Sequence, residues 1–152
     1  EGRPMFLRRP DSHLGLANFM RSHLYASLAT LKIGLDILLK EEDVKIDSIT
    51  GHGGLFKTKG VGQSILAAAM NAPISVMETA GEGGAWGMAL LAAYMLSKKD
   101  GQSLGDYLDS RVFAERKSET MEPDLADVAG FETYTKQYQA CLAAEKAAVQ
   151  AF

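Results

Sequence analysis

The sequence is poor in the features that mark several large classes of protein. It has one cysteine in 152 residues, so no disulfide can form within the chain and a reducing cytoplasm is expected. We interpret this residue, Cys141, as an inert packing residue of a helix. The net charge of −3 lacks the basic excess of nucleic-acid-binding proteins, so no nucleic-acid partner is expected. Charges at Lys32, Asp36 and Lys40 break the longest apolar stretches, which argues against a membrane span.

The composition that remains is that of an ordinary globular domain. Hydrophobic residues make up 47% of the chain and charged residues 23%, which is enough to form a buried core. A length of 152 residues fits one domain. The first residue is Glu1 rather than methionine, which predicts that the chain is a fragment of something longer.

The first half of the chain predicts two helices and two short strands. Apolar residues recur at spacings of three and four between 17 and 38, which predicts a helix over about 14–40 that Asp11 or Ser12 can cap. Residues 3–9 before it are expected to form an edge strand or an extended arm. Short apolar runs predict strands at 46–50 and 74–77, and a helix over about 58–71 lies between them. Asn71 and Pro73 are expected to end that helix.

The second half is predicted to be mainly helical. A glycine cluster at 81–87, interpreted as serving close helix packing, opens a helix that runs to about Leu96, with Trp86 and Met88 as core residues. Ser103 can cap a short helix to about 109, residues 111–123 are expected to be an exposed loop, and Asp124 can cap a last helix. That helix is expected to be interrupted near Gly130.

Strands that alternate with helices predict an α/β layered domain with short parallel strands flanked by helices, followed by a helical tail from about residue 103. Two strands are too few for a self-sufficient sheet, which again predicts a fragment and leaves an unpaired edge.

The most informative segment is Ile49-Thr50-Gly51-His52-Gly53-Gly54-Leu55-Phe56-Lys57-Thr58. A buried strand runs into glycines, whose backbone can approach a ligand closely, and the helix that follows offers free N–H groups to a phosphate. Two common nucleotide motifs are excluded. No register of residues 51–60 gives a P-loop, and a dinucleotide fingerprint would need glycine where Phe56 and Trp86 stand.

The order of these segments resembles the C-terminal signature of the FGGY carbohydrate kinases over residues 14–97. In that signature a strand ends in a Gly-Gly pair, here Gly53-Gly54, and a loop and a helix follow, here Val61–Met70. An X-Pro-Ile strand comes next, as Ala72-Pro73-Ile74, then an acidic residue, as Glu82. The segment Ala85-Trp86-Gly87-Met88-Ala89-Leu90-Leu91-Ala92-Ala93 takes the place of the family's Ala-Leu-Gly-Ala-Ala helix start.

The resemblance implies part of an actin-like, ribonuclease H-like ATPase domain that binds ATP, with Mg²⁺ in the intact enzyme. It implies that Gly53 and Gly54 lie against the phosphate and ribose, and that Leu55, Lys57 and Thr58 contact the adenosine. The catalytic aspartate and most sugar contacts of the family belong to an N-terminal kinase lobe. No catalytic residue and no metal ligand is therefore expected in this chain.

The tail resembles that of pentulose kinases, with Glu122-Pro123-Asp124 before a helix that carries Tyr134 and Tyr138. This makes xylulose the first expected substrate, with ribulose or the sugar of another FGGY kinase as alternatives. A fragment of this kind is expected to be inactive alone and to form a homo-oligomer. The alternative from another class is a non-catalytic α/β assembly module, in which the long helix mediates assembly and the glycines only turn the chain.

Overall fold

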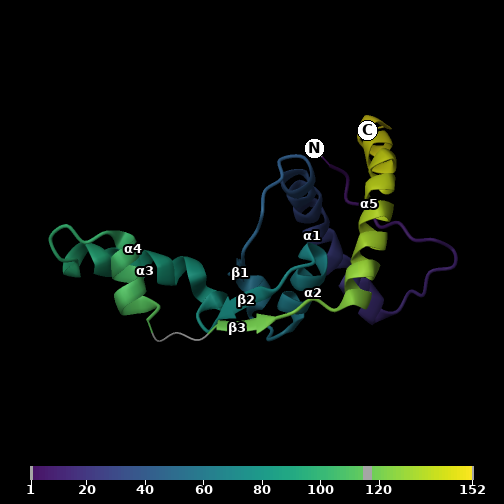
Figure 1. Ribbon diagram of the computed structural model, residues 1–152. Coiled ribbons are helices and arrows are strands. Elements are labelled where there is room, and N and C mark those ends of the chain that lie inside the picture. The colour runs from purple at the N-terminus through teal and green to yellow at the C-terminus, as the bar shows by residue number, and fades with distance from the viewer. Residues whose placement is uncertain (1, 115–117, 152) are drawn as a thin grey trace. The chain divides into compact units, whose positions relative to one another are not determined.

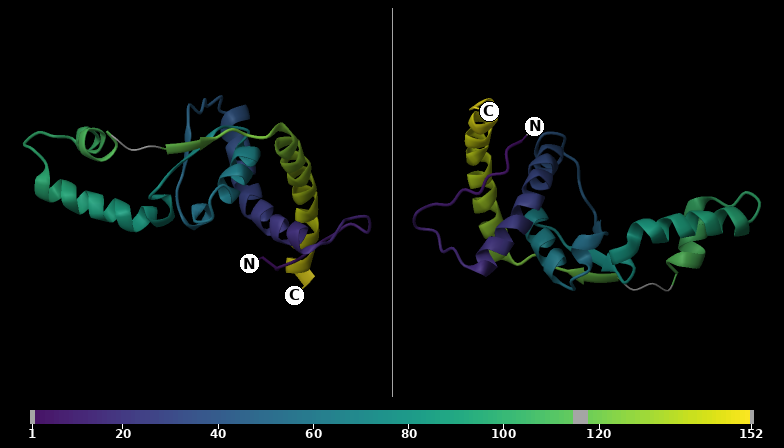
Figure 2. Two further views of the ribbon diagram at one scale, coloured as in Figure 1. Left: turned by 90° about the horizontal axis from the view of Figure 1, so that it is seen from below. Right: turned by 180° about the vertical axis from the view of Figure 1, so that it is seen from behind.

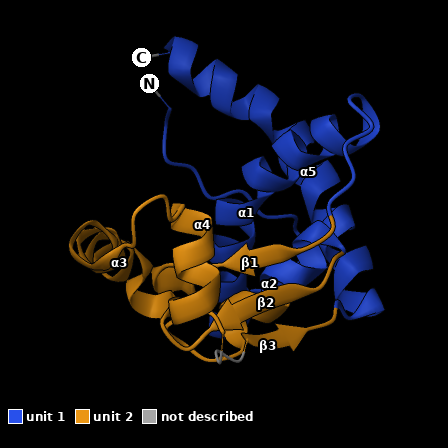
Figure 3. Ribbon diagram, turned by 60° about the vertical axis from the view of Figure 1, so that its left-hand side comes forward, with its two compact units in different colours: residues 1–46, 65–71, 123–152 blue, residues 47–64, 72–122 orange. Residues whose placement is uncertain are grey.

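The computed structural model describes residues 2–114 and 118–151 and divides the chain into two compact units (Figure 3). Unit 1 comprises residues 1–46, 65–71 and 123–152, and unit 2 comprises residues 47–64 and 72–122. Helix α2, Val61–Met70, contributes its first residues to unit 2 and the rest to unit 1.

Unit 1 is built around two long helices, α1 (Leu16–Lys40) and α5 (Leu125–Ala151), which pack against each other (Figure 1). Tyr25 of α1 and Phe131 of α5 are buried, and their ring centroids lie 4.8 Å apart. The predicted long helix is thus confirmed. Its N-cap is Gly15, whereas Asp11 or Ser12 was expected, and no side chain caps this end.

Helix α5 runs through Gly130 without interruption, so the predicted break there is wrong. Its start is capped as predicted, because the Asp124 carboxylate accepts hydrogen bonds from the backbone N–H groups of Ala126 (2.9 Å) and Asp127 (3.1 Å). Phe131 is fully buried directly after the glycine. Burial of its ring outweighs the roughly 1 kcal/mol by which a mid-helix glycine disfavours the helix.

The segment before α1 is an extended arm and not an edge strand. Residues 2–15 form no helix or strand, apart from a turn at Pro10 and Asp11 (Figure 2).

Unit 2 contains a mixed sheet of three strands in the order β1 (Ile49–Gly51), β2 (Ile74–Met77) and β3 (Ser118–Met121). Strands β1 and β2 are parallel, as predicted, with Ile49 opposite Ile74. Strand β3 is antiparallel to β2, so the expectation of an all-parallel sheet is wrong. The expected loop at 111–123 is also wrong, because part of it forms β3; its residues 115–117 lie outside the described residues.

Helix α3 (Gly83–Ser97) and the short helix α4 (Leu104–Tyr107) complete unit 2. Ser103 caps α4 as predicted, since its hydroxyl accepts a hydrogen bond from the Asp106 N–H at 3.1 Å. A single π-helical turn, Leu108–Val112, follows. Met88 was expected in the core, but it is 69% exposed on α3. Among the described residues, no helix combines the length and the apolar character that crossing a membrane requires.

Candidate functional site

The loop after β1 depends on glycine at two positions for two different reasons. Gly53 has φ 111° and ψ −175°, a backbone conformation that side-chain-bearing residues rarely adopt. Gly51 has no unusual φ, but a Cβ there would overlap the ring of Phe56. The chain then enters a single 3-10 turn, Gly54–Phe56, closed by a hydrogen bond from the Lys57 N–H to the Gly54 carbonyl at 3.2 Å.

The start of α2 packs directly against this turn. A Cβ at Gly62 would collide with the backbone carbonyl of Leu55 and lie 2.7 Å from its Cγ. Gly62 therefore lets the helix approach the turn closely, and it sets Leu55 against α2. Gly54 on the same turn is exposed, and a Cβ there would meet no atom within 4 Å.

The two glycine clusters of the sequence come together at this loop. The Gly53 N–H donates a hydrogen bond of 2.7 Å to the carbonyl of Ala80, which begins the 3-10 turn Ala80–Glu82. A Cβ at Gly83 would lie 3.1 Å from His52 Nδ1. The interpretation of the second cluster as a close-packing device fits Gly83, but the packing is against the first loop. At Gly84 and Gly87 a Cβ would meet nothing within 4 Å.

Both lysines of the loop form exposed ion pairs within unit 2. Lys57 Nζ lies 2.7 Å from Glu82 Oε1, and Lys59 Nζ lies 3.1 Å from Glu119 Oε2. The hydrogen bond from Lys57, together with its charge, lowers the pKa of Glu82, so this carboxylate is ionised at neutral pH.

A cavity of about 480 Å³ opens beside the loop within unit 2. Such a volume suits a small organic ligand. Its lining comes from the loop, the start of α2 and the strands β2 and β3: Phe56, Thr58, Lys59, Gly60, Gln63, Val76, Met77, Glu78, Ser118 and Glu119.

Gln63 is a buried polar residue in the lining of this cavity. Its side-chain Nε2 donates hydrogen bonds to the carbonyls of Ile74 (2.7 Å) and Glu119 (2.8 Å), and so ties α2 to β2 and β3. Sequence reasoning did not single out Gln63. The one feature of the sequence that could have indicated its role is that Gln63, beside Ser64, is a polar residue in an otherwise apolar helix.

The five predicted contact residues lie on one loop, but they differ in exposure and in the residues that they contact. Gly54, Lys57 and Thr58 are exposed, whereas Gly53 and Leu55 are half-buried. Thr58 lines the cavity, Lys57 faces Glu82, and Leu55 lies against α2. The turn therefore exposes Gly54, and Thr58, four residues further along, lines the cavity.

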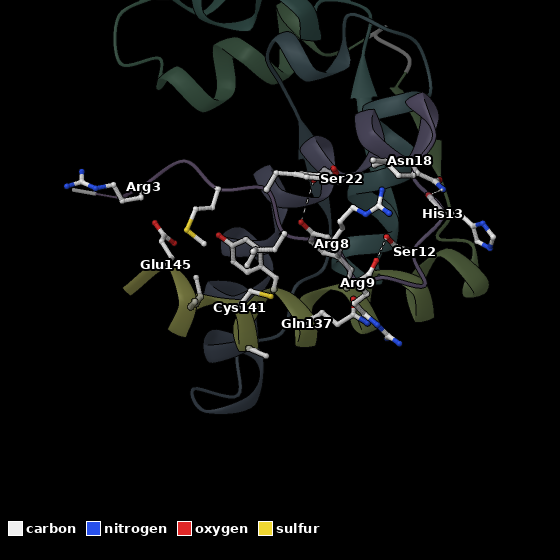
Figure 4. A pocket seen from close by; sticks show the side chains of 18 residues that line it. Arg3, Arg8, Arg9, Ser12, His13, Asn18, Ser22, Gln137, Cys141 and Glu145 are labelled. Atoms are coloured by element: carbon white, nitrogen blue, oxygen red, sulfur yellow. Dashed lines mark hydrogen bonds between the residues drawn. The ribbon is translucent and has the colours of Figure 1, made fainter. Parts of the chain in front are cut away.

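A larger cavity of about 650 Å³ lies in unit 1, between the N-terminal arm and α5 (Figure 4). Arm residues such as Phe6 and Leu7 line it on one side, and Tyr138 and Cys141 of α5 on the other. Cys141 is exposed, so its interpretation as a packing residue is wrong. Unlike the loop after β1, the arm lines its cavity with side-chain-bearing residues.

Within the described residues, no group of three or more His, Cys, Asp or Glu side chains is arranged to hold a metal ion.

The family model described as "FGGY family of carbohydrate kinases, C-terminal domain" matches residues 1–96. No curated protein and no solved structure matches the chain significantly.

Proposed function

Since the chain belongs to the FGGY family of carbohydrate kinases, as a C-terminal domain, we propose that it supplies the ATP-binding side of a sugar kinase. Membership implies an actin-like ATPase fold, an N-terminal kinase domain as partner, and transfer of a phosphoryl group from ATP to a sugar. The proposed domain extends over residues 1–152, with a helical tail from about residue 103. The proposed nucleotide contacts are Gly53, Gly54, Leu55, Lys57 and Thr58.

The observation that carries this assignment is the open backbone at Gly54. This residue is exposed at the start of the 3-10 turn, whereas the nearby Gly51 and Gly62 each face a packing neighbour and Gly53 has a positive φ. Gly54 has no such neighbour and no positive φ, so neither packing nor backbone strain requires glycine at this position. Close approach of a ligand is a use of glycine that fits this position, and the resemblance of the loop to the family signature distinguishes Gly54 from the equally open Gly84 and Gly87.

The nucleotide then has a simple placement. Its phosphates and ribose lie against Gly53 and Gly54, and its base enters the cavity past Thr58. The chain contributes positioning and charge rather than a reacting group, as is usual in phosphoryl transfer. We assign the base that deprotonates the sugar hydroxyl to the N-terminal domain.

For the sugar, we propose a pentulose, xylulose before ribulose. This rests on the tail, where Glu122 and Asp124 flank Pro123 ahead of the helix that carries Tyr134 and Tyr138. We also propose that residues 1–152 alone are inactive, because the proposed base lies outside them. Sugar-dependent ATP turnover by the pure chain would contradict this.

The test is ATP titration of the full-length kinase carrying Gly54→Val. A valine side chain fills the space proposed for the nucleotide, and φ at Gly54 is not positive, so the fold should tolerate it. We expect ATP affinity to fall at least about tenfold while stability changes by no more than about 1 kcal/mol. Gly130→Val is the matched control, because a Cβ at Gly130 also meets nothing within 4 Å.

Normal ATP binding by a folded Gly54→Val enzyme would show that the glycines only turn the chain. The assembly-module alternative would then account better for the structure.

A further inference from the structure

The ion pair between Lys57 and Glu82 joins the two glycine clusters of unit 2. Lys57 follows β1 and Glu82 ends the turn after β2, yet Nζ and Oε1 are only 2.7 Å apart. Two neighbouring contacts fix the position of this ion pair. The Gly53 N–H bonds the Ala80 carbonyl beside it, and a Cβ at Gly81 would lie 3.2 Å from Lys57 Cγ. The lysine stem therefore lies along a glycine backbone that brings its ammonium to the carboxylate.

This contact bears on how the loop meets an anion. The resemblance assigned Lys57 to the adenosine, but its ammonium is one of two cations on the loop that carries the proposed phosphate contacts Gly53 and Gly54, and Glu82 already neutralises its charge. An arriving phosphate gains the full attraction of Lys57 only by displacing the carboxylate. Until it does so, it also meets the negative charge of Glu82, which is ionised at neutral pH.

We propose that Glu82 competes with the phosphates of ATP for the Lys57 ammonium and so weakens nucleotide binding. The inference rests on the proposed function, because it deepens the role of the same loop. The effect is modest, since the two side chains are 59% and 74% exposed and water screens the pair. It depends on phosphate charge, so it acts on ATP and leaves adenosine unaffected.

The experiment measures ATP and adenosine affinities of the full-length kinase, as wild type, Glu82→Gln, Lys57→Met and the double variant. We expect Glu82→Gln to tighten ATP binding about two- to fivefold at low salt, with the gain lost at high salt. Adenosine affinity should not change. In the Lys57→Met background, Glu82→Gln should not tighten ATP binding, because the ammonium for which Glu82 and the phosphates compete is absent.

Asp127→Asn is the matched control. It also removes a negative charge from an exposed ion pair, with Arg21 at 4.0 Å in unit 1, and should leave ATP affinity unchanged. An equal gain in Asp127→Asn would reduce the effect to net charge and overturn the proposal.

Weaker ATP binding by Glu82→Gln would make the pair a support of the site and also overturn the proposal. The proposal would also be overturned if Glu82→Gln changed adenosine affinity as much as ATP affinity. An equal gain in ATP affinity in the Lys57→Met background would overturn it as well. Failure of the proposed function is a different result, in which Gly54→Val binds ATP as wild type does. If ATP binding is sensitive to Gly54 but not to Glu82, the nucleotide site stands and the competition is wrong.

Discussion

The side-chain amide of Gln63 joins three elements of unit 2 at one point. It is 5% exposed, and both of its N–H bonds go to strand carbonyls, one on β2 and one on β3. Strand β3 is short and mostly exposed, so it has little packing of its own. Gln63 thus holds in place one wall of the proposed nucleotide cavity.

We predict that Gln63→Leu lowers the free energy of unfolding by about 2 kcal/mol, because two strand carbonyls lose their donor, one in a buried and one in a part-buried site. Thermal denaturation of the full-length kinase measures this. Gln139→Leu on the exposed surface of α5 is the matched control and should melt near wild type. Equal melting temperatures for the two variants would show that the bonds of Gln63 contribute little.

At the residue scale, the sequence located the loop but not the part each glycine plays. A Gly-Gly pair after a strand indicates a turn, yet the pattern does not show that positive φ falls on Gly53 and open space on Gly54. Those properties depend on Phe56, Leu55 and Ala80, which pack around the loop only in the folded chain. Lys57 was predicted as a nucleotide contact, whereas its pairing with Glu82 was not visible in a linear pattern.

Two helical glycines allow a test of how α2 supports the loop. We predict that Gly62→Ala destabilises the protein by about 1–3 kcal/mol and weakens ATP binding, because the new Cβ collides with the Leu55 carbonyl. Gly87→Ala in α3 meets nothing within 4 Å and should instead stabilise it by about 0.5–1 kcal/mol. The measurements are melting temperatures and ATP titrations of both variants. A Gly62→Ala enzyme that melts above wild type with unchanged affinity would contradict this account.

At the element scale, local pattern predicted best where local forces dominate. The bounds of β2 were predicted correctly from its short apolar run, and those of α1 within two residues from its strong apolar period. Asn71 follows the end of α2, as predicted, with φ 49°. Strand β3 was missed because Ser-Glu-Thr-Met has no apolar face, and its strand geometry comes from pairing with β2. The continuity of α5 past Gly130 was missed because it depends on burial of Phe131 against α1.

At the scale of the whole molecule, large apolar side chains remain uncovered. On α3, Met88, Leu91 and Met95 follow helical spacing and are 69%, 45% and 76% exposed. On α1, Met20 and Leu31 are 55% and 51% exposed, although they belong to the predicted apolar stripe. Exposed apolar faces of this kind favour association with another surface. In the full-length kinase we assign that role to the N-terminal domain.

We therefore predict that residues 1–152 produced alone self-associate, and that Met88→Lys with Met95→Lys reduces the association. Light scattering over a concentration series measures it. Gln139→Lys, on an already polar surface, is the control for added charge. A clean monomer of the unmodified chain at high concentration would contradict the prediction.

We propose that ATP binds at the loop after β1, and hydrogen–deuterium exchange of the full-length kinase tests this without any mutation. Saturating ATP should slow exchange of the backbone N–H groups over residues 51–58. It should also slow exchange over residues 80–84, because the Gly53 N–H is bonded to Ala80. Helix α5 should be unaffected, since it belongs to unit 1 and carries none of the proposed ATP contacts. If ATP binds and protects another segment while residues 51–58 exchange as before, the nucleotide site lies elsewhere and the account is wrong.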